Sequence, residues 1–169
     1  MLPDILAPGL KAVICGTAVG TMSASVGHYF AQPGNDFWRL LHESGLTPQR
    51  LSPDGDATLP QFGLGLTDLA KNVAQSHDRG LTYDVDGFRA KIDRYRPARV
   101  VLHGKEAGRA ARGSRGPLSL GVQTWRVADV PVFVVPSASG ANRRASYDGR
   151  PSRLAWWTEM ASAIKEGSA

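Results

Sequence analysis

Short apolar runs, each closed by a glycine, alternate with helical segments along this chain of 169 residues. Ala12–Cys15 precedes Gly16, and Arg99–His103 precedes Gly104. Runs of this length predict strands that are buried on both faces. Because helical segments separate the runs, their order predicts an α/β fold with a mostly parallel sheet and helices on both of its faces. The length fits a single domain over residues 1–169.

Helical spacing of apolar residues predicts helices over 36–42, 84–96 and 151–164. A short strand is expected over 62–66, followed by a turn at Thr67-Asp68 and a helix that begins near Leu69. The other expected segments are loops at 16–20, 52–61 and 113–121, a short helix ending near 112, and two strands at hairpin-like spacing, 123–127 and 132–135.

Cysteine and hydropathy exclude several protein classes. A single cysteine, Cys15, rules out an internal disulfide framework and a cysteine-rich zinc site, and it fits a reducing cytoplasm. No apolar run approaches the roughly 20 residues that span a bilayer, and the start lacks the pattern of a secretory signal. The four histidines show no metal-ligand spacing. We therefore expect a cytoplasmic monomer without a bound metal or membrane contact.

The charge is mildly basic, with 20 Lys and Arg against 15 Asp and Glu. Arginine supplies 15 of the basic residues, and its planar guanidinium binds phosphate well. Such an excess favours binding to polyanions such as DNA, but a solvated arginine-rich surface is the more common explanation of a surplus this small. The seven basic residues between Arg94 and Arg115 therefore do not by themselves indicate a nucleic-acid site.

Ligands of parallel sheets bind beyond the carboxyl ends of the strands. Three loops are expected at that edge, over 16–30, 67–77 and 136–144. The glycines at 16–20 match neither a P-loop nor a dinucleotide fingerprint. Aromatic residues on such loops can stack a nucleobase, which makes Tyr29 and Phe30 candidates for a pocket wall.

Motifs spread over most of the chain carry a family resemblance. They are Asp4–Leu10, Cys15-Gly16, Gly20, Phe30-Ala31, Pro33, Asn35, Phe37-Trp38, Gly65–Thr67, Gly104-Lys105 and Pro136–Arg143. In order and spacing they resemble the mismatch-specific uracil/thymine DNA glycosylases of the uracil-DNA glycosylase superfamily. The resemblance implies a three-layer α/β/α sandwich that binds double-stranded DNA with damaged or mismatched bases. It also implies that uracil, or a related pyrimidine, is flipped out and its N-glycosidic bond hydrolysed without a cofactor.

The chain departs from the family at the first motif, where an asparagine normally positions the attacking water. Ala18 stands there, and a methyl group can neither orient nor deprotonate water. Asp68 is our prediction for the replacement, because it follows Thr67 at a position that faces the pocket in this superfamily. A plain helix N-cap at Asp68 explains the same residues. Asn72 and His77 are weaker alternatives.

The remaining site residues follow from the same resemblance. The base is expected to bind Gly16 and the backbone N–H groups of Thr17, Ala18 and Gly20. Its ring is expected to stack on Phe30, and its C5 edge is expected to contact Ser23. Ser137 takes the place of the second family asparagine, and Ala141 that of the wedge residue. The residues expected to contact DNA are Lys105, Gly140, Ala141, Asn142, Arg143 and Arg144. A catalytically weak or inactive lesion- or mismatch-binding protein of the same fold is the alternative, and a nucleotide-binding enzyme is a more remote one.

Overall fold

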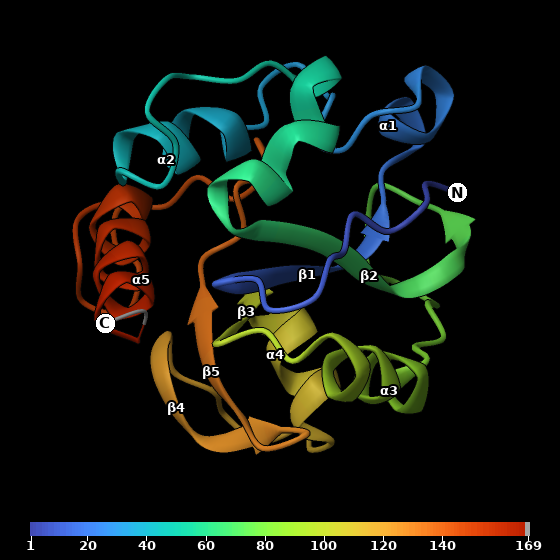
Figure 1. The fold of residues 1–169 in the computed structure, drawn as a ribbon. Helices are drawn as coiled ribbons and strands as arrows, with labels where there is room; N and C mark the ends of the chain where they lie inside the picture. The colour runs from blue at the N-terminus through green and yellow to red at the C-terminus, as the bar shows by residue number, and fades with distance from the viewer. Residues whose placement is uncertain (168–169) are drawn as a thin grey trace.

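A five-stranded sheet forms the centre of the computed structural model, which describes residues 1–167 (Figure 1). The strand order is β2-β1-β3-β5-β4. All neighbouring pairs are parallel except β4 and β5, which form an antiparallel hairpin. The bounds of the strands are β1 Ala12–Val19, β2 Leu64–Ala74, β3 Val100–His103, β4 Gly121–Val127 and β5 Val130–Val135. The expected mostly parallel sheet is confirmed.

Helices cover both faces of the sheet, so the three-layer α/β/α arrangement is also confirmed. In Figure 1, α2, α5 and the 3-10 helix η1 lie on one side of the sheet, and α3 and α4 lie on the other. The bounds are α1 Thr21–Val26, α2 Phe37–Glu43, η1 Pro53–Phe62, α3 Val85–Tyr95, α4 Lys105–Arg112 and α5 Arg153–Gly167. Among residues 1–167, no helix is both long enough and apolar enough to cross a membrane.

The inner strands β1, β3 and β5 are buried because most of their side chains are apolar. Ile14 of β1, Leu102 of β3 and Phe133 of β5 are at most 1% exposed. Large rings from the helices close the core on each side, including Trp157 of α5 and Phe88 of α3. This packing fixes the carboxyl ends of β1, β3 and β5 at one edge of the sheet.

The strand β2 corrects the prediction of a turn at Thr67-Asp68 and a helix from Leu69. The chain stays extended to Ala74, and Asp68 lies opposite Gly16 of β1. Leu69 and Ala70 are buried in the sheet. Thr67 and Asp68 have the residue types of a helix start. Hydrogen bonding to β1 and burial in the sheet outweigh that local preference.

Two further segments differ from expectation. Residues 16–19 are not a loop, because β1 continues as a strand to Val19. Residues 53–62 form η1 rather than a loop, with Pro53 at its start and Gly63 ending it in a left-handed conformation. The short helix α1 that follows Gly20 was not predicted, because six residues are too few for a periodic signal.

Candidate active site

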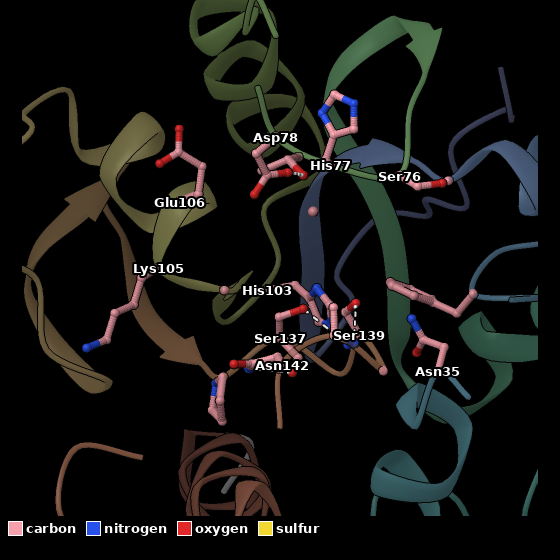
Figure 2. A pocket seen from close by; sticks show the side chains of 18 of the residues that line it. Asn35, Ser76, His77, Asp78, His103, Lys105, Glu106, Ser137, Ser139 and Asn142 are labelled. Atoms are coloured by element: carbon pink, nitrogen blue, oxygen red, sulfur yellow. Dashed lines mark hydrogen bonds between the residues drawn. The ribbon is translucent and has the colours of Figure 1, made fainter. Parts of the chain in front are cut away.

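A cleft of about 950 Å³ lies at the carboxyl edge of the sheet (Figure 2). Its walls come from the end of β1, the segment after α1, the segment after β2, the start of α4, and the loop after β5. Figure 2 shows His77 and Asp78 on one side, and Ser137, Ser139 and Asn142 on the other. This is the edge where parallel sheets bind ligands.

The cleft brings together nearly all of the residues predicted from the sequence. Those expected to act on or bind the base line it: Gly16, Thr17, Ala18, Gly20, Ser23, Tyr29, Phe30, Asp68 and Ser137. Of those expected to contact DNA, the following also line it: Lys105, Gly140, Ala141, Asn142 and Arg144. Arg143 lies outside, with its side chain 64% exposed and one guanidinium nitrogen 4.0 Å from Asp36.

Asp68 is a buried carboxylate at the wall of this cleft. Its side chain is 5% exposed. A Cβ placed on Gly16 would lie 3.1 Å from Oδ1 of Asp68, so this oxygen faces the backbone of β1. The other oxygen, Oδ2, is buried without a hydrogen bond and lies 3.6 Å from Nζ of Lys71. Burial raises the pKa of Asp68 to about 6, and the nearby Lys71 opposes that rise.

The structure also places the alternatives to Asp68 as the water-activating residue. A helix N-cap at Asp68 is excluded, because the residue lies within β2. Asn72 is exposed, lies on a strand instead of a helix, and does not line the cleft. His77 does line the cleft, and its ring contacts the side-chain amide of Gln75. Asp68 is therefore the buried carboxylate of the cleft, and His77 is an exposed group at its rim.

A Gly16→Ala substitution tests the space between β1 and Asp68. The added methyl group would crowd Oδ1 at 3.1 Å and displace any water that this oxygen binds. We expect base-release activity to fall by about 10- to 100-fold, because misplacement of reacting groups is costly. Gly116→Ala is the matched control, since nothing lies within 4 Å of its added methyl group. Equal single-turnover rates in both variants would contradict this role of Gly16.

The end of β1 is capped by the segment that follows β2. Thr17 donates a hydrogen bond to Oδ1 of Asp78 at 2.7 Å, and Gln75 N–H donates to the carbonyl of Val19 at 2.8 Å. β1 pairs with β3 only as far as Cys15. The edge of β1 beyond that point is therefore open toward the cleft, where its backbone groups can meet a ligand. The sequence did not predict Asp78 as a site residue, because it belongs to no motif and to no periodic pattern.

The aromatic wall of the cleft is built around Phe30. Its ring stacks on Phe37 at a centroid distance of 3.9 Å and lies 5.1 Å from the ring of His103. Phe30 has a φ of +52°, a strained value that the surrounding contacts hold in place. Ser23 accepts a hydrogen bond from Ala31 N–H and so supports this turn. Tyr29 lines the cleft but is only 4% exposed.

A buried arginine of α5 holds the loop after β5 in place. Arg153 of α5 is 6% exposed, forms an ion pair with Asp36, and donates hydrogen bonds to the carbonyls of Ser137 and Ser139. His103 accepts a hydrogen bond from Ala138 N–H at its Nε2. Burial and Arg153 lower the pKa of His103 to about 4, so this ring is neutral at pH 7 and can accept that hydrogen bond.

The basic residues at and near the cleft are partly neutralised. Lys105 pairs with Asp148 at 2.7 Å, and Asp148 also accepts from Leu120 N–H. Within the run from Arg94 to Arg115, Arg112 donates to backbone carbonyls of the loop that follows it, and Arg115 pairs with Glu106. Part of this run therefore serves the fold. Among residues 1–167, no group of three or more His, Cys, Asp or Glu side chains could hold a metal ion.

Comparisons with known proteins agree with this architecture. The family model described as the uracil DNA glycosylase superfamily matches residues 3–161. A solution NMR structure from Methanosarcina acetivorans, of a protein provisionally assigned as a uracil DNA glycosylase, has a similar fold. The TM-score is 0.59 and the identity 23%, over 97% of this chain and 96% of that one.

Proposed function

The chain belongs to the uracil DNA glycosylase superfamily, whose members are DNA glycosylases, and we propose that it removes uracil from double-stranded DNA. Related deaminated or mismatched pyrimidines are further candidate substrates, as in the mismatch-specific branch that the sequence resembles. We propose that residues 1–169 act as one monomeric domain without a cofactor. The observation that carries this proposal is the buried carboxylate of Asp68 at the cleft, in a chain that has Ala18 at the usual asparagine position.

The proposed reaction begins with extrusion of the base, because the sugar carbon C1′ cannot be reached inside the stacked duplex. Phe30 offers a ring surface for the base, and the open edge of β1 offers backbone groups. The departing base takes the electron pair of the N-glycosidic bond, which leaves positive charge on the sugar. The Asp68 carboxylate favours that charge, accepts a proton from water, and so allows the water oxygen to bond to C1′.

A dependence of activity on pH follows from Asp68. The carboxylate works as a base only when ionised, and its pKa is about 6. The rate should therefore rise with pH through about pH 6 and level off above it. The measurement is the second-order rate of base release at enzyme concentrations below saturation, which reports the free enzyme. A rate that is flat from pH 4.5 to 8 would contradict the assignment.

Lys71 does not provide a nucleophile in this proposal. Its Nζ lies 2.8 Å from the Leu2 carbonyl, 3.0 Å from Asp4 and 3.2 Å from the Tyr29 hydroxyl, so its protons are engaged as hydrogen-bond donors. Borohydride should trap no covalent protein–DNA adduct during base release. A trapped adduct that disappears in Lys71→Met would show a Schiff-base mechanism instead.

A lesion-binding protein without catalysis is the second candidate, and Ala18 is the observation that favours it. The test is base release from duplex and single-stranded oligonucleotides that contain uracil, mismatched thymine, hypoxanthine or ethenocytosine. We expect release from uracil in duplex DNA. Tight binding to a lesion with no release from any substrate would favour the second candidate.

A further inference from the structure

A cluster of charged groups adjoins Asp68, and its members Lys71, Asp4 and Lys91 do not line the cleft. Lys71 is nearest, with Nζ 3.6 Å from Oδ2 of Asp68 and 3.0 Å from Oδ1 of Asp4. Lys71 does not line the cleft, and its side chain is 26% exposed. We therefore expect its effect on the reaction to pass through Asp68, which does line the cleft.

We propose that Lys71 is a positioning residue for the reaction: its ammonium group holds Oδ2 of Asp68 and keeps the carboxylate ionised, which leaves Oδ1 for the attacking water. This inference rests on the proposed glycosylase function. It gives distinct roles to two oxygens whose surroundings differ, since Oδ2 is buried toward Lys71 and Oδ1 faces Gly16 of the cleft wall.

The position of Lys71 is fixed by oxygen atoms from several segments. The Leu2 carbonyl, the Asp4 carboxylate and the Tyr29 hydroxyl surround its ammonium group at 2.8, 3.0 and 3.2 Å. Tyr29 in turn donates to the carbonyl of Pro3. Such a cage leaves the ammonium little freedom to leave Asp68. The amino-terminal segment thus completes the site, although it does not line the cleft near Asp68.

Other charged or titratable groups face Asp68 from each neighbouring element. Asp4 carries negative charge, because its bonds to Lys91, Thr67 and Lys71 outweigh burial and lower its pKa. Lys91 of α3 pairs with Asp4 at 2.7 Å. Burial raises the pKa of the Cys15 thiol and of the Tyr29 hydroxyl, so both stay neutral. Lys71 is thus the cation in direct contact with Asp68.

Lys71→Met tests the proposal, with Lys91→Met as a matched control that removes the other lysine bonded to Asp4. In Lys71→Met the pH midpoint of base release should rise by about one unit, which lowers the ionised fraction at pH 6 about fivefold. The Kd for uracil-containing duplex should not change. Lys71→Arg should restore the wild-type midpoint, and Lys91→Met should move it far less.

A second readout separates this inference from the proposed function. The ¹³Cγ chemical shift of Asp68 reports its ionisation by NMR whether or not the protein releases a base. A wild type that releases no base would overturn the proposed function, while the NMR titration still measures the effect of Lys71. The inference is overturned if Lys71→Met moves the Asp68 midpoint no further than Lys91→Met does. If Lys71→Met does not fold, Lys71→Gln is judged by the same criterion.

Discussion

Asp68→Ala should lower the single-turnover rate of uracil release by about 10²–10⁴-fold, the usual contribution of a positioned general base. Asp68→Asn should lose a large part of the activity as well, because an amide can hold water but cannot accept its proton. It should also abolish the rise of the rate near pH 6. Both variants are measured with enzyme in excess over a uracil-containing duplex, so that product release does not limit the rate.

The free energy of unfolding of both Asp68 variants serves as the control, because it separates a loss of catalysis from a loss of folded protein. Asp68 is buried and its Oδ2 makes no hydrogen bond, so neutral replacements should not destabilise the fold greatly. DNA binding should be retained in both variants. Wild-type rates in Asp68→Ala would eliminate Asp68 as the general base. His77 and Asp78, at the rim of the cleft, would then be the next candidates for that role.

Arg153→Met should be the most destabilising of the substitutions considered. It removes the ion pair with Asp36 and two hydrogen bonds to the loop after β5, from a side chain that is 6% exposed. The expected loss in the free energy of unfolding is about 3 kcal/mol, because a buried charge network is broken on one side. Urea unfolding measures this loss. The Kd for DNA should rise as well, because the backbone of residues 137–141 loses its anchor.

Arg143→Met is the matched control, since Arg143 lies 4.0 Å from the same carboxylate of Asp36 but is 64% exposed. It should change stability by less than about 0.5 kcal/mol. Any increase in Kd in Arg143→Met would then come from lost DNA contacts. An equal loss of stability in both variants would contradict the anchoring role of Arg153.

The mostly parallel character of the sheet could be predicted from the sequence, because apolar runs such as Ala12–Cys15 give a strong local signal. The course of the chain after Thr67 could not. Asp68 and Lys71 are polar residues in a strand, and their burial depends on pairing with β1 and on ion pairs with the distant Asp4. Contacts between residues so far apart in sequence leave no local periodicity to detect.

The candidate site was predictable where a motif stood on an expected loop. The carboxyl-edge rule and the family resemblance together placed Phe30 and Ser137 at one cleft, and they line it. Asp68 lines the same cleft, but from within strand β2 and not from the expected turn. The anchoring role of Arg153 was not predictable, because its partners Ser137 and Ser139 use backbone carbonyls that any residue supplies. The sequence shows which side chains have suitable chemistry, whereas the fold determines which of them contact one another.

The central proposal is that this cleft hydrolyses the N-glycosidic bond of uracil in DNA, and that Asp68 takes the role of the asparagine that the family resemblance leads us to expect at the position of Ala18. The most direct measurement is quantification by mass spectrometry of free uracil from a uracil-containing duplex under an excess of protein. The account predicts stoichiometric uracil with the wild type and only trace amounts in the same time with Asp68→Ala. Intact DNA bound by the wild type with no free uracil would contradict it.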